Sequence, residues 1–293
     1  MLSPKNFWPS TQFGGLDETL SDFQSARFVV LPCPYDSTTT WRVGTRTGPA
    51  SLLEASMNME LWDYELQRDI SQVGIHTTDD IAPEMNGPEA MKNRVREVVG
   101  ETLDAGKFPI FIGGEHSLTL GGVEALAARS EKISILQIDA HTDLRDEYAG
   151  TRFGHGCVMR RCSEISNVAK IVQVGLRSAS QEEMEQKPAN CAQFWAENIV
   201  ANFDFWIPQI LEHLEGDVFI TLDVDGLDPA HMPSTGTPEP GGLSYYQTLS
   251  LLRAVCAAKN VRAFDCLELV GGDAPSAFCA AKIVYKTMGY LTE

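Results

Sequence analysis

Short hydrophobic runs alternate along the chain with longer amphipathic stretches. The runs are nearly continuous in hydrophobicity and rich in Val, Ile and Phe, which is typical of parallel β-strands that are buried on both faces. We predict such strands at residues 27–31, 108–112, 133–138, 170–174, 217–222 and 261–267.

The amphipathic stretches between these runs indicate helices. Their expected ranges are 49–62, 88–105, 118–129, 202–214, 243–258 and 274–290. Pro88 suits the first turn of a helix, and Gly106 suits the position just beyond its end. Ser244, followed three residues later by Gln247, predicts a capping box near the start of the 243–258 helix.

Strands and helices alternate over the whole length of the chain, which predicts an α/β fold with a parallel sheet in a single-domain, three-layer αβα arrangement. A length of 293 residues is routine for one such domain, and no linker or repeat divides the sequence. We therefore expect a single domain over residues 1–293, with residues 1–26 as an amino-terminal extension or arm.

The charge balance narrows the classes of partner. The chain has 23 Lys and Arg residues against 40 Asp and Glu residues, a formal net charge of −17. Nucleic acids and anionic membranes attract basic surfaces, so we expect neither as a partner. A negative field does concentrate cationic small molecules, although the same charge also serves simply to keep a protein dispersed.

The cysteines and the apolar runs indicate the cellular compartment in which the protein is found. Seven cysteines without a C-x-x-C pair, most of them inside apolar runs, favour reduced and buried thiols. The first 13 residues lack the pattern of a secretory signal, and no uninterrupted apolar run approaches the length of about 18 residues that a transmembrane helix needs. We expect a cytoplasmic protein.

Polar segments with acidic and histidine side chains follow three of the predicted strands. They are Gly113-Gly114-Glu115-His116-Ser117, Asp139-Ala140-His141-Thr142-Asp143 and Asp223-Val224-Asp225-Gly226. The carboxyl ends of parallel strands meet at one edge of a sheet, and alternate side chains of an extended segment share one face. Four carboxylates and two imidazoles are therefore expected to converge there.

Such a cluster predicts metal ions. Buried carboxylates repel one another unless a cation compensates their charge. Six ligands exceed the need of one tetrahedral zinc and suit two metals that share carboxylates. Oxygen ligands with two imidazoles suit Mn²⁺, and Co²⁺, Ni²⁺ or Fe²⁺ also fit. Any one segment alone has a simpler interpretation, in which Asp139 and Asp223 cap strand ends and His116 lies in a surface loop.

These three segments resemble the signature segments of the ureohydrolase family, which contains the arginases and agmatinases. The likeness extends to Tyr35-Asp36-Ser37-Thr38-Thr39, to Gly44-Thr45-Arg46-Thr47-Gly48-Pro49, and to Asp228-Pro229 followed by the segment from Thr235 to Gly242, all of which are similar to agmatinases. The resemblance covers residues 28–290. It implies an arginase-like fold with a dimanganese site at the strand ends, and a homotrimer or homohexamer.

The resemblance also implies a role for each residue. Asp139 and Asp223 would bridge two Mn²⁺ ions; His116 and Asp143 would complete the shell of one ion, and His141 and Asp225 that of the other. His155, in Gly154-His155-Gly156, matches the family's catalytic histidine, and Glu268 matches the glutamate that receives the guanidinium group. The sequence departs from the family pattern after Glu268, where Leu269-Val270-Gly271 replaces Asn or Ser followed by Pro.

A reaction follows from these roles. A metal-bridging water with a lowered pKa would supply the hydroxide that attacks the guanidinium carbon. Glu268 would hold the guanidinium through two parallel hydrogen bonds. Asp143 and His155 would deliver a proton to the leaving amine. This predicts a hydrolase that cleaves a small cationic guanidino substrate to urea and an amine.

Two positions bear on the substrate. Arginases hold the α-carboxylate and α-amino groups with an Asn and an Asp, where this chain has Arg145 and Ser178. We therefore expect agmatine or a close analogue such as N1-aminopropylagmatine rather than arginine. Guanidino or formimino acids stay open as substrates, because Arg145 or Arg177 offers a partner for a carboxylate. A non-catalytic metal-binding member of the family and a single-zinc deacetylase are competing interpretations of the whole chain.

Overall fold

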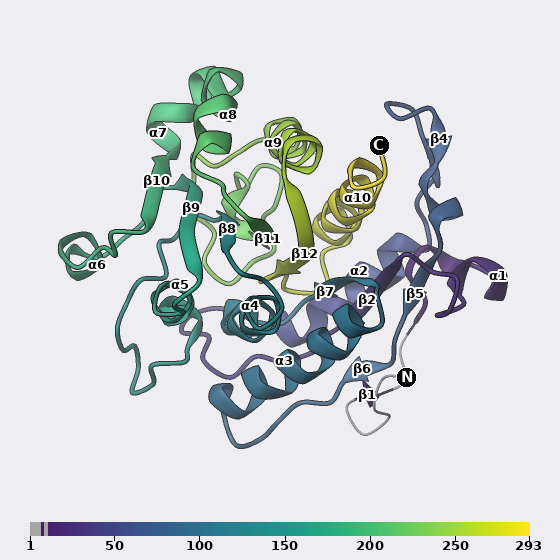
Figure 1. Ribbon diagram of the computed structural model, residues 1–293, viewed down its shortest axis with the longest axis horizontal. Helices are drawn as coiled ribbons and strands as arrows, with labels where there is room; N and C mark the ends of the chain where they lie inside the picture. Colours follow the sequence, from purple (N-terminus) through teal and green to yellow (C-terminus); the bar gives the residue numbers. More distant parts are fainter. Residues whose placement is uncertain (1–6, 9–10) are drawn as a thin grey trace.

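A parallel β-sheet forms the centre of the computed structural model, which describes residues 7–8 and 11–293. Its spatial order is β10 (Cys191–Trp195), β9 (Val168–Leu176), β8 (Ile133–Ile138), β11 (Asp217–Asp223), β12 (Asn260–Leu267), β7 (Phe108–Ile112), β2 (Phe28–Pro32) and β5 (Ile75–Thr77). Every neighbouring pair is parallel. The central strands therefore come from distant parts of the chain (Figure 1).

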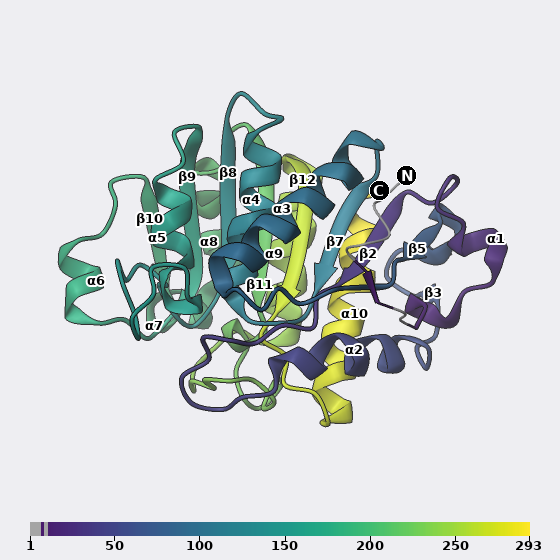
Figure 2. The same cartoon turned by 90° about the horizontal axis from the view of Figure 1, so that it is seen from below.

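Helices cover both faces of the sheet (Figures 1 and 2). One layer contains α3 (Pro88–Asp104), α4 (Thr119–Ala127) and α5 (Val158–Ser163). The other contains α2 (Gly48–Ser56), α8 (Phe203–Glu212), α9 (Tyr245–Ala258) and α10 (Ala274–Tyr290). The predicted single-domain αβα architecture with a parallel sheet is confirmed.

The remaining helices and strands among the described residues are short. The short helices are α1 (Glu18–Ser21), α6 (Gln181–Glu185) and α7 (Ala196–Ile199), and the short strand pairs are β1 (Phe7–Trp8) with β6 (Asp80–Ile81) and β3 (Trp62–Asp63) with β4 (Arg68–Asp69). Single 3₁₀ turns occupy Phe13–Gly15, Thr45–Thr47, Ile70–Val73, His116–Leu118, His155–Cys157, Val200–Asn202 and Val224–Gly226.

The two faces of the sheet carry separate hydrophobic clusters, one under each helix layer. All six residues of β8 are buried, as the continuous hydrophobicity of that run predicts. On the α3–α4 side the helices approach closely at Gly121, where an added Cβ would lie 2.4 Å from the carbonyl oxygen of Lys92. Glycine is therefore required where α3 and α4 cross, and α4 also packs against β11 and β12.

Most predicted elements are confirmed with small shifts at their ends. The strands 108–112 and 133–138 and the helix 274–290 have the expected bounds, and Ser244 and Gln247 form the expected capping box. The helix predicted at 49–62 is wrong beyond Ser56, because Trp62–Asp63 pairs instead with Arg68–Asp69. The edge strands β5 and β10 were not predicted; they are short and only partly buried, so their hydrophobic signal is weak.

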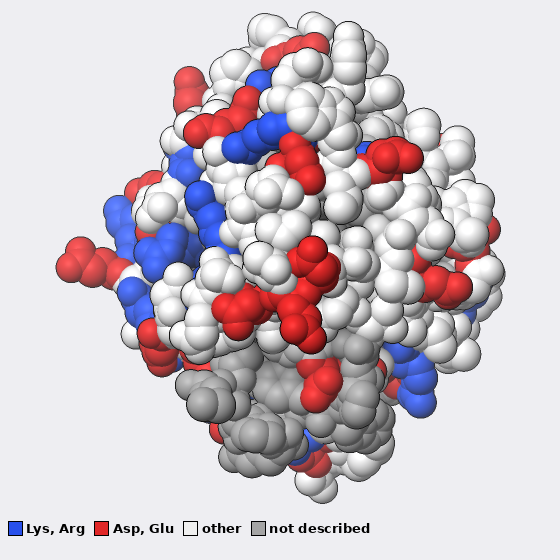
Figure 3. Space-filling view, turned by 90° about the vertical axis from the view of Figure 1, so that its right-hand side faces the viewer, with Lys and Arg blue, Asp and Glu red and all other residues white. Residues whose placement is uncertain are grey.

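The amino-terminal segment contacts the body of the protein within its described part. Phe13 is buried, and its backbone N–H donates to Thr77 Oγ1 at 2.8 Å. Residues 1–6 and 9–10 of the expected extension lie outside the described residues. On the face that carries the β5 edge, acidic and basic side chains are interspersed (Figure 3). No helix in the described residues combines the length and apolarity needed to cross a membrane. All seven cysteines are free thiols.

Candidate metal centre and active site

Four adjacent strands at the middle of the sheet supply the candidate site. In spatial order they are β8, β11, β12 and β7. Asp139 follows β8, Asp223 is the last residue of β11, Glu268 follows β12, and His116 lies four residues beyond β7. Because the strands are parallel and adjacent, these side chains meet at one edge of the sheet.

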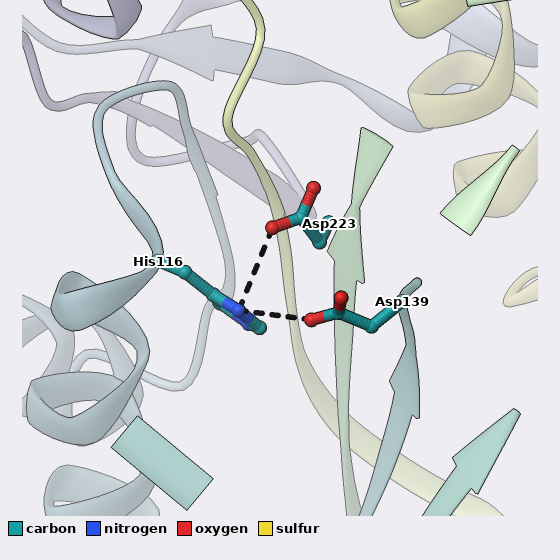
Figure 4. Close-up of side chains that lie close together, drawn as sticks. All are labelled: His116, Asp139 and Asp223. Atoms are coloured by element: carbon teal, nitrogen blue, oxygen red, sulfur yellow. Dashed lines mark ion pairs between the residues drawn. The ribbon is translucent and has the colours of Figure 1, made fainter. Parts of the chain in front are cut away.

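His116 faces three carboxylates. Its Nδ1 atom lies 2.8 Å from Asp143 Oδ2, 3.1 Å from Asp139 Oδ2 and 3.6 Å from Asp223 Oδ2. Figure 4 shows His116, Asp139 and Asp223 pointing toward one another, the two aspartates from the ends of β8 and β11 and His116 from the turn that follows β7. The histidine and the three carboxylates are all buried, so water cannot screen the carboxylates from one another.

A second group shares Asp139 with the first. His141 Nδ1 lies 3.0 Å from Asp225 Oδ2 and 3.6 Å from Asp139 Oδ1. Backbone N–H groups fix these carboxylates, because Ala140 donates to Asp225 at 3.0 Å and Asp225 donates to Asp223 at 2.9 Å. The structure therefore brings together all six residues expected as ligands, in two groups that meet at Asp139.

The electrostatics of this cluster favour bound cations. Burial, followed by the charges of Asp225 and Asp139, raises the pKa of Asp223 well above its usual range. Against the lowering effect of burial, the Asp225 and Asp139 carboxylates raise the pKa of His141 to about 12. The site thus attracts positive charge strongly. Oxygen-rich groups with one imidazole each suit two divalent ions, and the residues present fit such a pair.

The second ring nitrogen of His116 is held by a chain of hydroxyl groups. His116 Nε2 lies 2.9 Å from Thr221 Oγ1, which lies 3.2 Å from Thr119 Oγ1. Thr119 in turn donates to Asp265 Oδ2 at 2.8 Å, and Asp265 is fully buried in β12. Metal-binding histidines commonly use their second nitrogen in this way, because the hydrogen bond fixes the orientation of the ring.

Glu268 is buried and lines the same pocket as His116, His141, Asp143 and Asp223 of the two carboxylate–histidine groups. The backbone N–H of His116 donates to Glu268 Oε1 at 2.6 Å. Glu268 has a φ of 65° and Asp143 a φ of 52°, left-handed conformations that non-glycine residues rarely adopt. Such backbone strain is concentrated at functional sites, where the surrounding structure holds it in place.

His155 lines the pocket from the 3₁₀ turn His155–Cys157. Its ring packs edge-on against Tyr148 at a centroid distance of 5.9 Å, and its Nδ1 atom lies 3.1 Å from Thr38 Oγ1. Burial lowers the pKa of the His155 imidazole, which favours the neutral ring. A threonine and a tyrosine thus hold His155, whereas aspartates surround His116 and His141.

The two arginines considered as carboxylate receptors differ in whether the guanidinium group faces the pocket or is bound to backbone carbonyls. Arg177 is occupied by backbone carbonyl oxygens, including those of Gly175 at 2.9 Å and Glu239 at 2.7 Å, so it cannot receive a substrate carboxylate. Arg145 lines the pocket, where its guanidinium lies over the Tyr148 ring at 4.5 Å. Ser178 also lines the pocket.

Glu183 is a pocket residue that the sequence patterns above did not single out. It is buried and accepts hydrogen bonds from Thr142 Oγ1 at 2.7 Å and from the Leu144 N–H at 2.9 Å. It also forms a capping box with Ser180 at the start of α6. The S-x-x-E spacing of Ser180 and Glu183 is the signal from which this helix start was predictable.

The pocket that these side chains line has a volume of about 260 Å³ and opens at an outer rim. His116, Asp143, Asp223 and Glu268 lie on its inner side, while Trp41, which is 68% exposed, belongs to the rim. Four of its lining side chains are acidic, namely Asp143, Glu183, Asp223 and Glu268, and two are basic, namely Arg42 and Arg145.

Comparisons with known proteins agree with this geometry. The family model described as "Arginase family" matches residues 26–289. The N(1)-aminopropylagmatine ureohydrolase of Synechocystis sp. is 37% identical over 100% of this chain and 98% of its own length. The agmatinase of Pyrococcus horikoshii is 34% identical over 92% of this chain and 93% of its own. The crystal structure of the agmatine ureohydrolase of Thermoplasma volcanium superposes with a TM-score of 0.87 at 29% identity, covering 97% of this chain and 95% of its own.

The family model and the relatives each cover nearly the whole chain, well beyond the three signature segments. The predicted membership and the arginase-like fold are therefore both confirmed, and the chain is an enzyme of the agmatinase type. The chain belongs to the arginase family of ureohydrolases.

Proposed function

We propose that this enzyme uses two Mn²⁺ ions to hydrolyse the guanidino group of agmatine or of N1-aminopropylagmatine, which releases urea and the amine. The observation that carries the proposal is the pair of carboxylate–histidine groups that meet at Asp139 and are buried except for the partly exposed His141, with Glu268 in the same pocket.

The proposed ligands of one ion are His116, Asp139, Asp143 and Asp223; those of the other are Asp139, His141, Asp223 and Asp225. Asp139 and Asp223 would be the residues shared by both ions, which is supported for Asp139 by its place in both groups. When bound, two such ions would supply hydroxide near neutral pH by lowering the pKa of water.

Glu268 is proposed to receive the guanidinium. A guanidinium carbon is a poor electrophile and has to be held in place, and a carboxylate does this through two parallel hydrogen bonds. Burial raises the pKa of Glu268 to about 8, and a cationic guanidinium beside it stabilises the charged carboxylate. Glu268 Oε1 already accepts from His116 N–H, which fixes the direction in which the carboxylate points.

Proton transfer is assigned to His155 and Asp143. Both line the pocket, and the neutral His155 ring is able to accept a proton and return it to the leaving amine. The Asp143 carboxylate lies 2.8 Å from His116 Nδ1, inside the first carboxylate–histidine group. Asp143 is therefore both a proposed metal ligand and a lining residue of the pocket that His155 lines.

The choice of substrate rests on what the pocket lacks. Ser178 carries no charge for an α-amino group. Of the two arginines considered for an α-carboxylate, Arg177 is occupied by backbone carbonyls and Arg145 pairs with Glu183 at 3.8 Å. The Synechocystis and Pyrococcus relatives are named for the two guanidino amines proposed here. The exposed rim at Trp41 leaves room for an amine tail that extends beyond the pocket.

A urea assay across guanidino compounds tests the proposal. The purified protein with added Mn²⁺ is given agmatine, N1-aminopropylagmatine, arginine and 4-guanidinobutyrate, and kcat/KM is measured for each. We expect the two guanidino amines to exceed arginine by at least about 10²-fold, since Ser178 offers no charge to the α-amino group of arginine. Equal rates with arginine, or no urea from either amine, would overturn the assignment. Light scattering on the same sample tests the proposed homotrimer or homohexamer.

A further inference from the structure

Glu115 is a fully buried carboxylate that belongs to neither carboxylate–histidine group. Its oxygens accept four hydrogen bonds. The donors are the backbone N–H of Ser37, the backbone N–H of Thr38 at 2.6 Å, Ser117 Oγ at 2.6 Å and Thr38 Oγ1 at 2.8 Å. A carboxylate accepts hydrogen bonds and donates none, so this ring of donors suits an ionised Glu115.

The Thr38 hydroxyl lies between Glu115 and the proposed catalytic histidine. Thr38 Oγ1 is 3.1 Å from His155 Nδ1 and accepts from the His155 backbone N–H at 3.0 Å. The loops approach closely at Gly154, where an added Cβ would lie 3.4 Å from Thr38 Oγ1. Thr38 itself does not line the substrate pocket, so its effect on the reaction has to pass through His155.

The positions of the hydrogens follow from counting donors. A threonine hydroxyl has one hydrogen and two lone pairs. The bond to the Glu115 carboxylate is charge-assisted, which makes it the stronger use of that hydrogen. Both lone pairs of Thr38 then face His155, one toward its backbone N–H and the other toward Nδ1. Nδ1 must therefore carry a proton, and Nε2 is the bare nitrogen of the neutral ring.

We propose that Thr38 and Glu115 are positioning residues that hold His155 in the tautomer with Nδ1 protonated and Nε2 free to exchange a proton in the pocket. In the proposed hydrolysis, Nε2 takes a proton from the attacking water as its oxygen bonds to the guanidinium carbon. Nε2 then returns the proton to the leaving amine nitrogen as the C–N bond to that nitrogen breaks, so the ring ends the cycle neutral. The inference deepens the proposed function and rests on its assignment of proton transfer to His155.

The opposite arrangement of the Thr38 and His155 hydrogens also predicts a single tautomer. If Thr38 donated its hydrogen to His155 Nδ1, the Glu115 carboxylate would lose one of its four donors, and Nε2 would carry the ring proton. The neutral ring would then be unable to accept a proton at the nitrogen that remains for the pocket. The two arrangements differ in one observable, which is the protonated ring nitrogen of His155.

Nuclear magnetic resonance of ¹⁵N-histidine-labelled, full-length protein reads this directly. Loading with Zn²⁺, which is diamagnetic, avoids line broadening by manganese, and a His155→Gln sample identifies the resonances of His155. We expect a protonated Nδ1 and a bare Nε2. The opposite tautomer would overturn the proposal, whatever the enzyme's activity.

Kinetics of a matched pair of variants test the consequence. Thr38→Val removes the hydroxyl with little change of shape, whereas Thr38→Ser keeps it. We expect Thr38→Val to lower kcat by about 10- to 10²-fold, part of the roughly 10²–10⁴-fold that a positioned acid–base group contributes, with KM and metal content near wild type. Thr38→Ser should restore most of the rate.

Three results would contradict the positioning role. They are a wild-type kcat in Thr38→Val, an equal defect in Thr38→Ser, and loss of metal from Thr38→Val, since each would show that the hydroxyl does not act through His155. If the wild-type protein releases no urea from any guanidino amine, the proposed function fails, while the resonance experiment still decides the tautomer.

Discussion

The backbone N–H of His116 donates to the carboxylate of Glu268 at 2.6 Å, which links a proposed metal ligand after β7 to the proposed guanidinium receptor after β12. The two strands are neighbours in the sheet, although 152 positions separate the two residues in sequence. The departure from the family pattern after Glu268 therefore leaves its carboxylate at the same edge of the sheet as the proposed ligands.

Glu268→Gln should keep the fold and both metals but lose most urea production. Glutamine still offers an oxygen to His116 N–H but no charge to the guanidinium, so we expect kcat/KM for agmatine or N1-aminopropylagmatine to fall by about 10²-fold. Urea release and metal analysis measure the two effects. Glu212→Gln, on the exposed side of α8, is the control. Wild-type kinetics in Glu268→Gln would show that another carboxylate holds the guanidinium.

His155→Ala should lower turnover without releasing metal. His155 is held by Thr38 and Tyr148 rather than by the carboxylates, and loss of a positioned proton-transfer group slows turnover by roughly 10²–10⁴-fold. Steady-state kinetics and elemental analysis of the same preparation separate turnover from metal binding. His231→Ala, at an exposed loop position outside the pocket, should behave as wild type. Metal loss in His155→Ala would instead identify His155 as a ligand.

Metal content should depend differently on Asp139 and Asp225. Wild-type protein loaded with Mn²⁺ should contain about two equivalents per chain, as a dinuclear site requires. Asp139 belongs to both groups and Asp225 to one, so Asp139→Asn should lose both ions and Asp225→Asn about one. Elemental analysis after gel filtration checks this. One equivalent in the wild type, or equal losses in the two variants, would rule out the shared-ligand arrangement.

Arg177→Met should loosen the segment that carries Asp225. The Arg177 guanidinium donates to the carbonyl oxygens of Asp225, Leu227 and Glu239. Leaving these buried carbonyls unpaired should lower the free energy of unfolding by about 2–3 kcal/mol and weaken metal binding. Urea unfolding with a chelator present, and metal titration without it, measure the two effects. Arg152→Met, which removes a surface ion pair, should change either quantity little; unchanged stability in Arg177→Met would contradict the bracing role.

Asp80→Asn should stabilise the protein at neutral pH but not in acid. Burial, followed by the charge of Asp79, raises the pKa of Asp80 to about 6. Unfolded aspartate titrates near 3.9, so the folded state binds this proton more tightly, and stability falls as the pH rises from about 4 through 6. The substitution should add about 1 kcal/mol at pH 7, after allowance for partial solvent exposure, and nothing near pH 3.5.

Urea unfolding at the two pH values measures that difference, with Asp204→Asn on the exposed surface of α8 as the control. A gain that is the same at both pH values would show that the carboxyl group of Asp80 does not titrate between them.

The local pattern of the chain is sufficient to predict most of the secondary structure and the members of the candidate metal site. Strands such as 133–138 are continuously hydrophobic because both faces are buried, and the acidic and histidine residues follow them directly. The edge strands and the end of the 49–62 helix were not predictable in this way, because half-buried residues carry little pattern and because the pairing of Trp62–Asp63 with Arg68–Asp69 is a tertiary contact.

Tertiary structure alone decided how these residues combine. The order β8-β11-β12-β7 puts Asp139, Asp223, Glu268 and His116 side by side, and no local signal encodes the neighbours of a parallel strand. The same holds for the contacts that surround the site. Thr38 contacts His155, which lies 117 positions away in sequence. The guanidinium of Arg177 donates to backbone carbonyl groups and is therefore not free to bind a substrate. Such contacts depend on distances of about 3 Å between distant segments, which only the folded chain determines.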